Sequence, residues 1–289
     1  MKVLVTGANG QLGTDLCRVL RDFELIPLTD QDIEISDISS VKQAFGKYEP
    51  DIIINTAAFV RVDDCEDEKD KAYSVNALGA RNVAVVAQEL GAKLVHLSTD
   101  YVFGGEAEPR ATPYTEFDTP VPLSHYGKSK LAGENLARHF CLRHFIVRTS
   151  GLFGVAGSMG KGGNFIETML KLSRERDELR VVDDQVFSPT YSRDLARKIV
   201  RLMTTDYYGI FHITNRGACS WYEFTKEILR LAGTKTPVVP IASDQYPQKA
   251  RRPSYSVLDN YHLRLLGMDD MRPWQEALKD YLVARGHIR

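Results

Sequence analysis

Residues 2–13 read KVLVTGANGQLG, an apolar run that passes directly into a turn with three glycines. The run predicts a buried strand, and the apolar spacing of residues 11–20 predicts a helix after the turn. Gly7 suits the tight turn, Gly10 lets a pyrophosphate approach the backbone, and Gly13 lets the helix pack on the sheet. A plain strand-to-helix turn is the alternative. Because a helix start presents free N–H groups and partial positive charge, we favour a dinucleotide-binding turn.

The same alternation continues along the first half of the chain. Short apolar runs predict further buried strands at residues 25–28, 52–54, 94–97 and 145–147. Amphipathic spacing predicts helices at residues 40–45, 69–90 and 124–140. Because strands that alternate with helices form right-handed βαβ units, we expect an α/β fold with a doubly wound parallel sheet of the Rossmann type.

The pattern changes after residue 150. Six glycines stand within residues 151–163, and we expect this stretch to be a mobile loop. Helices are predicted at residues 165–174, 194–203, 221–231 and 273–285, with short strands at 179–182 and 210–213. We therefore expect residues 1–150 to form a dinucleotide-binding domain. Residues 151–289 would form a smaller α/β region that mainly binds substrate, with some chain returning to the sheet.

The composition argues against several classes of protein. With 37 basic and 38 acidic residues, the formal net charge of −1 gives no general attraction to nucleic acid or to an anionic membrane. No apolar run approaches the roughly 18 residues of a membrane-spanning helix. The start of the chain carries no secretory signal pattern, so we expect a cytoplasmic protein. Cys17, Cys65, Cys141 and Cys219 lie far apart, which favours free thiols over a zinc site or disulfides.

The GxxGxxG spacing of the glycine turn resembles that of the extended short-chain dehydrogenase/reductase family. The resemblance implies that the small residues of NTAAF, residues 55–59, let a nicotinamide cofactor lie over the strand ends, and that Asp37 and Ile38 lie beside its adenine. The expected cofactor contacts are Gly7, Gly10, Gln11, Leu12, Gly13, Asp30, Asp37, Ile38, Ala57, Ala58, Tyr126 and Lys130.

Asp30 ends the second predicted strand about twenty residues beyond the glycines. An acid at this point accepts hydrogen bonds from the hydroxyls of the adenosine ribose. No basic residue near Asp30 indicates a pocket for the 2′-phosphate, so the sequence favours NADH over NADPH, although either cofactor is compatible with it. The alternative is that Asp30 only starts a turn.

Tyr126 and Lys130 stand four residues apart in HYGKSKLAGE, so they share one face of a helix. A free tyrosine has a pKa near ~10, which the Lys130 ammonium and an oxidised nicotinamide would lower. Thr99 follows the fourth strand and would hydrogen-bond a substrate carbonyl oxygen. We predict that Tyr126 protonates the alkoxide as hydride arrives, and that Lys130 also holds the nicotinamide ribose. A solvated Tyr–Lys pair is the alternative.

The residues after Thr99 separate reactions within the resembled family. Sugar-nucleotide dehydratases carry an Asp-Glu pair there, which eliminates water across the sugar ring, whereas this chain has Asp100 followed by Tyr101. Epimerases usually carry small residues in place of Asp100. The incomplete acid/base pair favours reduction over dehydration.

Four motifs, STDYVFG, YGKSKLAGE, SPTY at residues 188–191 and RPS at 252–254, resemble the dTDP-4-dehydrorhamnose reductase family over essentially the whole chain. The resemblance implies reduction of the 4-keto group of a nucleotide-linked deoxysugar, with dTDP-4-dehydro-L-rhamnose as the first candidate. The implied substrate contacts are Asp100, Val102, Asn164, Gln185 and Arg252. Arginine also suits a diphosphate because it binds phosphate in a bidentate manner. The alternatives are a surface charge for Arg252 and a helix N-cap for Asn164.

One departure from that family concerns Gly151, which follows Thr149 and Ser150 where the family has a tryptophan beside the sugar. We expect a reshaped sugar pocket, so a different nucleotide-linked 4-keto sugar stays an alternative substrate. The same fold could also serve a non-catalytic regulatory subunit or an epimerase, and the retained Tyr126 and Lys130 argue against the regulatory subunit. A homodimer stays open.

Six carboxylates stand within residues 63–70. We interpret them as solvated charge near a helix N-terminus, where negative charge favours the helix dipole. Some relatives bind magnesium at a dimer interface, but Asp15 is the single matching acid in this chain. We therefore predict no metal.

Overall fold

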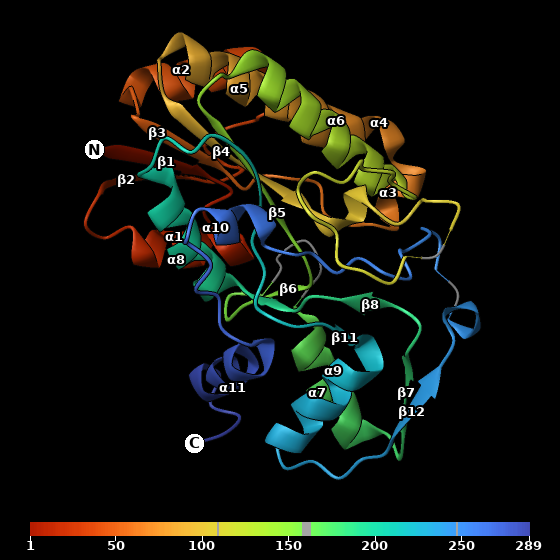
Figure 1. The fold of residues 1–289 in the computed structure, drawn as a ribbon. Coiled ribbons are helices and arrows are strands. Elements are labelled where there is room, and N and C mark those ends of the chain that lie inside the picture. Colours follow the sequence, from red (N-terminus) through yellow and green to blue (C-terminus); the bar gives the residue numbers. More distant parts are fainter. Residues whose placement is uncertain (109, 158–162, 247) are drawn as a thin grey trace.

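The computed structural model describes residues 1–108, 110–157, 163–246 and 248–289. Its central sheet has six parallel strands in the order β2–β1–β3–β4–β5–β10 (Figure 1). These are β1 Lys2–Thr6, β2 Glu24–Leu28, β3 Ile52–Asn55, β4 Lys93–Thr99, β5 His144–Thr149 and β10 Gly209–His212. The strand order reverses between β1 and β3, where open α/β sheets bind ligands beyond the carboxyl ends of their strands. The predicted doubly wound fold is confirmed.

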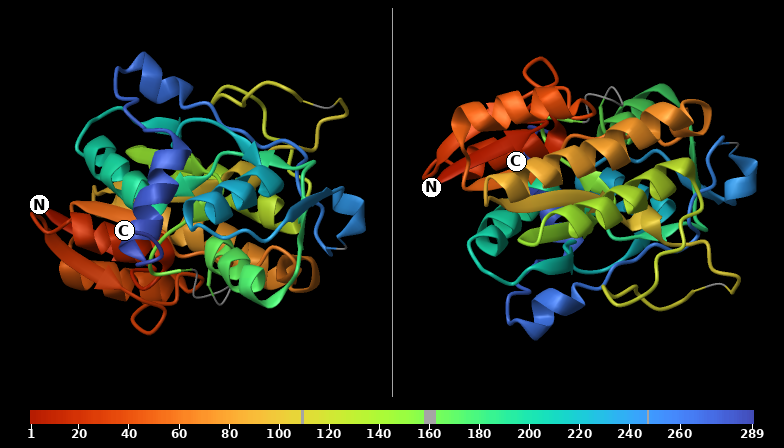
Figure 2. Two further views of the ribbon diagram at one scale, coloured as in Figure 1. Left: turned by 90° about the horizontal axis from the view of Figure 1, so that it is seen from below. Right: turned by 90° about the horizontal axis from the view of Figure 1, so that it is seen from above.

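Helices cover both faces of this sheet. One face carries α1 Gln11–Val19 and α8 Ser192–Met203, and the other carries α2 Ile38–Tyr48, α5 Ala80–Glu89 and α6 His125–Phe140, which lie side by side (Figure 2). Successive residues of a strand point to opposite faces. Val3 and Val5 therefore pack with Leu16 of α1, while Leu4 packs with Val41 of α2.

The helix predicted over residues 69–90 is interrupted. It consists of α4 Lys69–Tyr73, a π-helical turn at Ser74–Gly79 and α5, and it follows the short helix α3 Asp64–Asp67. The wide turn presents Asn76, whose side chain bonds both backbone groups of Phe59 at 2.8 and 3.0 Å and the hydroxyl of Ser129 at 3.0 Å. Such π-turns are frequent at functional sites. The apolar spacing gave no sign of this one.

The second layer lies below the sheet in Figure 1. It contains β6 Leu152–Phe153, α7 Phe165–Glu175, β7 Leu179–Val182, β8 Val186–Phe187, β9 Thr190–Tyr191, β11 Cys219–Ser220, α9 Trp221–Leu231, β12 Val238–Ile241 and α11 Trp274–Ala284. Its separate core is rich in aromatic rings, among them Phe153, Phe187, Phe224 and Tyr281. Residues 158–162 of the predicted mobile loop lie outside the described residues.

The chain between α9 and α11 returns across the carboxyl ends of the central strands. Single bridges join Tyr255 to Val186 of β8 and Leu258 to Tyr114, after which α10 Tyr261–Leu265 packs beside β10. This return brings residues 250–256 over the end of β4. Within the described residues, no helix is long and apolar enough to cross a membrane. None of the four cysteines forms a disulfide in the described part of the chain.

Candidate active site

The glycine turn leaves open space in front of α1. Gly7 has a φ of +68°, and a Cβ on Gly13 would lie 2.1 Å from the Gly7 carbonyl oxygen, so the fold itself requires both glycines. A Cβ on Gly10 would meet only the Gly7 oxygen, at 3.1 Å. This contact is tight for a Cβ but much milder than the one at position 13, so packing within the protein is a weaker reason for glycine at position 10. No side chain caps the N-terminus of α1, which leaves its N–H groups for an anion.

Asp30 lies exposed at the end of β2, where its carboxylate accepts a 3.0 Å hydrogen bond from the side-chain amide of Asn9. Sequence reasoning missed Asn9, although it stands inside the glycine turn. Asp37 caps α2 by accepting a bond from the backbone N–H of Ser39, and Ile38 packs partly into the core. Ala57 and Ala58 follow β3 and are half-buried.

The three residues predicted to carry out the reaction lie together. Thr99 ends β4, and its side chain lies beside the phenol of Tyr126, in the first turn of α6. Ser124 caps that helix through the backbone N–H of Gly127. Lys130 is 3% exposed, and its ammonium donates a 2.6 Å hydrogen bond to the carbonyl of Leu97. Strand β4 and helix α6 therefore hold a proton donor, a hydroxyl and a cation at one point.

Burial dominates the electrostatics of this group. It raises the pKa of Tyr126 well above its ordinary value, and the charge of Asp100 adds to the rise. It also lowers the pKa of Lys130 to about 8, against the opposing effect of Glu134. From the sequence we predicted that Lys130, together with an oxidised nicotinamide, would lower the pKa of Tyr126. In the protein alone, the pKa of Tyr126 is raised instead. The phenol stays protonated, which suits a proton donor.

Asp100 is buried beside Tyr126 and accepts three hydroxyl hydrogen bonds. Thr99 donates at 3.1 Å, Ser150 at 2.7 Å and Ser256 at 2.6 Å. Burial raises the pKa of Asp100, and these three bonds oppose the rise. Asp100 thereby ties the ends of β4 and β5 to the returning segment. Its contact with a substrate stays a prediction, and Ser256 could not be found from the sequence because it comes from a distant part of the chain.

Two of the predicted substrate contacts have other partners in the structure. The side chain of Val102 is fully buried with Phe103 and Leu258, which leaves only its backbone for a ligand. Asn164 caps α7: it accepts from the backbone N–H of Glu167 at 3.0 Å and donates to the Tyr281 hydroxyl at 2.8 Å. The N-cap alternative for Asn164 is therefore correct, and its contact with a substrate stays a prediction.

Gln185 is buried in the connection between β7 and β8, directly before β8. Ser188 directly follows β8, and its backbone N–H bonds the hydroxyl of Ser150 at 3.3 Å, which links the end of this strand to the Asp100 cluster. The predicted role of Gln185 stays a prediction.

Arg252 forms a two-point ion pair with Asp63, with N–O distances of 3.2 and 2.9 Å. It also lies beside the phenol of Tyr101, and its side chain is 15% exposed. The surface-charge alternative for Arg252 is therefore wrong. Its place next to Tyr101 brings it to the site, but its guanidinium already holds a carboxylate.

From the sequence we interpreted the acidic run at residues 63–70 as solvated charge, but several of these carboxylates have protein partners. Asp63 and Asp67 pair with Arg252 and Lys249 of the returning segment, and Glu66 accepts a 2.8 Å hydrogen bond from the backbone N–H of His125 at the start of α6. Among the described residues, no group of three or more His, Cys, Asp or Glu could hold a metal ion. Asp15 is buried and bonded to Arg18 and Ser192.

Gly151 is required by an aromatic ring from another element. Its φ is +52°, and a Cβ there would lie 2.4 Å from two ring atoms of Phe187. Phe187 stacks on Trp221 with ring centroids 4.0 Å apart. An aromatic ring therefore does stand beside position 151, although it comes from β8. The sequence could not reveal that Phe187 supplies this ring, because the two residues are distant in the chain.

The residues at this end of the sheet fit a nicotinamide dinucleotide. Within the described part of the chain, Gln11 Oε1, Thr149 Oγ1 and Ser188 Oγ are buried and lack a hydrogen-bond partner. Gln11 opens α1 next to Gly10, and Thr149 lies opposite Thr99 in the sheet. Buried polar atoms normally have partners, so these atoms favour a polar ligand laid from the glycine turn to Tyr126.

The chain is similar to known proteins over nearly its whole length. The model of the family described as the RmlD substrate binding domain matches residues 1–285. The spore coat polysaccharide biosynthesis protein SpsK of Bacillus subtilis (strain 168) is 46% identical, with 98% of each chain covered. The dTDP-4-keto-6-deoxy-D-glucose reductase of Streptomyces niveus is 38% identical, over 95% of this chain and 94% of that protein. The solved dTDP-4-dehydrorhamnose reductase of Bacillus anthracis str. Ames, in complex with NADP, has a TM-score of 0.93 and 44% identity, covering 98% of this chain and 99% of that chain.

Proposed function

This chain belongs to the family of the RmlD substrate binding domain, and we propose that it uses NADH or NADPH to reduce the 4-keto group of a nucleotide-linked deoxysugar. The first candidate substrate is dTDP-4-dehydro-L-rhamnose, which the reaction would convert into dTDP-L-rhamnose. The observation that carries the proposal is the grouping of the Tyr126 phenol, the Thr99 hydroxyl and the buried Lys130 ammonium where α6 packs on the end of β4. The name of the Bacillus anthracis relative supports it.

The bound nicotinamide supplies a hydride to the ketone carbon. The hydroxyl of Thr99 donates its proton to Asp100 in the protein alone and would turn it to the ketone oxygen when substrate binds. Tyr126 gives its phenolic proton to that oxygen as negative charge develops. Because the pKa of Tyr126 is raised by burial, the phenol holds a proton before the reaction. Lys130 holds the nicotinamide ribose, and its positive charge stabilises the phenolate left behind.

The sugar nucleotide would lie between the end of β4 and the returning segment. Arg252 would bind the diphosphate, since a guanidinium matches phosphate oxygens at two points. Asp63 occupies the same donors in the protein alone, so the phosphate has to take its place or share the guanidinium with it. Phe187 would form the apolar side of the sugar pocket, next to Gly151.

A second candidate substrate is a dTDP-4-keto-6-deoxy-D-glucose. Two observations favour it as an alternative: the 38% identity to the Streptomyces niveus reductase, and the aromatic ring that comes from Phe187 instead of from position 151. The two candidate substrates differ in how the sugar would fit the pocket, whereas the chemistry at Tyr126 would be the same for both.

The test is a reaction with each keto sugar and each cofactor. The protein is mixed with NADH or NADPH and with dTDP-4-dehydro-L-rhamnose or dTDP-4-keto-6-deoxy-D-glucose, and both absorbance loss and sugar product are followed. We expect cofactor oxidation that matches alcohol formation, with the higher kcat/KM for the rhamnose precursor. Product formed without net cofactor oxidation would indicate an epimerase, and no turnover of either sugar would refute the proposal.

A further inference from the structure

Glu134 and Arg148 form an ion pair that is sealed inside the protein below the active site. Glu134 is 0% exposed and Arg148 is 1% exposed. The guanidinium reaches the carboxylate through Nε at 3.0 and 3.2 Å and through one terminal nitrogen at 2.7 Å. Removing two charges from water costs free energy that the attraction between them often fails to return. Stability alone is therefore a weak reason for such a pair at this point.

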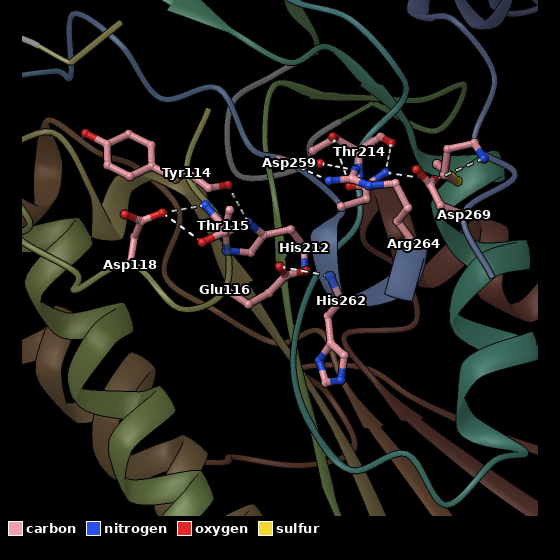
Figure 3. Close-up of polar contacts among 12 residues, drawn as sticks. Tyr114, Thr115, Glu116, Asp118, His212, Thr214, Asp259, His262, Arg264 and Asp269 are labelled. Atoms are coloured by element: carbon pink, nitrogen blue, oxygen red, sulfur yellow. Dashed lines mark hydrogen bonds and ion pairs between the residues drawn. The ribbon is translucent and has the colours of Figure 1, made fainter. Parts of the chain in front are cut away.

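Further contacts complete the network around the pair. The hydroxyl of Ser98 donates to Glu134, and Arg148 donates to Nε2 of His212 at 3.4 Å. His212 in turn donates from Nδ1 to the carbonyl of Tyr114 at 3.0 Å, and its backbone N–H bonds Glu116 (Figure 3). Burial and the charge of Arg148 lower the pKa of His212 to about 3, so this ring is neutral.

Ser98, Glu134 and Arg148 each lie within four residues of an active-site residue in the sequence. Ser98 precedes Thr99, and its other neighbour, Leu97, supplies the carbonyl that holds Lys130. Glu134 lies one helical turn after Lys130 on the same face of α6. Arg148 leads into Thr149 and Ser150, and Ser150 donates to Asp100. The network thus joins β4, α6 and β5 where these elements carry the site.

The ionisable groups around Lys130 come from three elements. His96 on β4 is held neutral, because burial and the charge of Lys130 lower its pKa. Tyr126 on α6 is protonated, and Arg148 on β5 is already paired with Glu134. Glu134 is the charged group that raises the pKa of Lys130. A carboxylate held by Arg148 thus acts on the cation of the site.

We propose that Glu134 is a positioning residue for the reduction: its bonds to Ser98 and Arg148 fix α6, and with it the Lys130 ammonium one turn earlier, in register with the ends of β4 and β5. Arg148 pairs with Glu134 inside the protein, and Ser98 carries the connection to Thr99. The role in catalysis rests on the proposed function, whereas the effect on Lys130 does not.

The test uses three variants of the full chain. Glu134→Gln removes the charge but keeps the size of the side chain. Glu134→Gln with Arg148→Met removes both charges, which avoids an unpaired buried guanidinium. Glu134→Asp keeps the charge and is the conservative control. For each variant we would measure thermal unfolding, NADPH affinity against pH by nicotinamide fluorescence, and kcat/KM against pH.

In the two variants that lack the Glu134 carboxylate, we expect the fall of NADPH affinity and kcat/KM at high pH to begin about one pH unit lower than in the wild type. The reason is the loss of a unit negative charge one helical turn from Lys130. Glu134→Asp should keep the pH profile of the wild type. A double variant with the wild-type pH profile and a Tm near that of the wild type would overturn the proposal and leave the pair a purely structural role. A wild type that binds NADPH but reduces no sugar would refute the proposed function alone, since the fluorescence titration still reports on Lys130.

Discussion

The phenol of Tyr126 lies beside the hydroxyl of Thr99, across the contact between α6 and the carboxyl end of β4. Replacing Tyr126 by Phe removes the proton donor and keeps the ring. We expect kcat to fall by about 10²–10⁴-fold, the range for loss of a general acid, with NADPH affinity unchanged. Steady-state kinetics and a fluorescence titration measure the two quantities. Tyr101→Phe is the matched control, because its ring packs 5.8 Å from that of Tyr126 and it should keep most of the activity.

The glycine turn separates a role in folding from a role in binding. Gly10→Ala should lower NADPH affinity by about tenfold or more, since the methyl group enters the space of the pyrophosphate. Its Cβ would lie 3.1 Å from the Gly7 oxygen, so we expect a loss of Tm that is smaller than that of Gly13→Ala. Gly13→Ala should destabilise the fold, because its Cβ would lie 2.1 Å from a backbone oxygen. Gly46→Ala in α2 has open space and is the control. Normal NADPH binding by Gly10→Ala would argue against the cofactor site.

Arg252 provides a test of the substrate side. Arg252→Lys keeps the charge but loses the two-point grip, so we expect KM for the sugar nucleotide to rise by about tenfold with little change in NADPH affinity. Lys249→Ala removes an exposed ion pair of the same segment and should have little effect. Equal KM values for the two variants would show that Arg252 does not contact the diphosphate.

Glu167 makes the stability of the second layer depend on pH. Partial burial opposes the shift, but hydrogen bonds from Tyr281, His287 and Arg285 lower the pKa of Glu167 to about 2. This stabilisation is fully present above the ordinary value of 4.5 and is lost as the pH falls through about 2. Glu167→Gln should therefore lower Tm by about 2–4 °C at pH 7, and by less at pH 3. Glu175→Gln, in an exposed pair with Lys171, is the control; an equal loss at both pH values would contradict the account.

The parts of the fold that follow local spacing could be predicted from the sequence. The central strands and α6 lie where apolar runs and helical periodicity indicate them, because each buries its apolar face against the same sheet. Tyr126 and Lys130 share a helix, and Thr99 ends a strand, so short-range rules were sufficient to bring these three to one edge.

The rest depends on contacts between distant segments. Asp63 and Ser256 reach the site through a return of the chain that no local pattern encodes. Phe187 lies beside Gly151 only after β8 packs on the loop beyond β5. Asparagine serves both as a helix cap and as a ligand-binding residue, so the sequence could not distinguish the two roles of Asn164. The structure shows the cap, and the contact with a substrate stays a prediction.

The most direct measurement of the central claim follows the hydride itself. The protein is given NADPH deuterated at the transferable position of nicotinamide C4, together with dTDP-4-dehydro-L-rhamnose, and the sugar product is analysed by mass spectrometry. We predict one deuterium at C4 of dTDP-L-rhamnose from the wild type, and almost no product from Tyr126→Phe in the same time. A product without deuterium at C4, or undiminished turnover by Tyr126→Phe, would contradict the account.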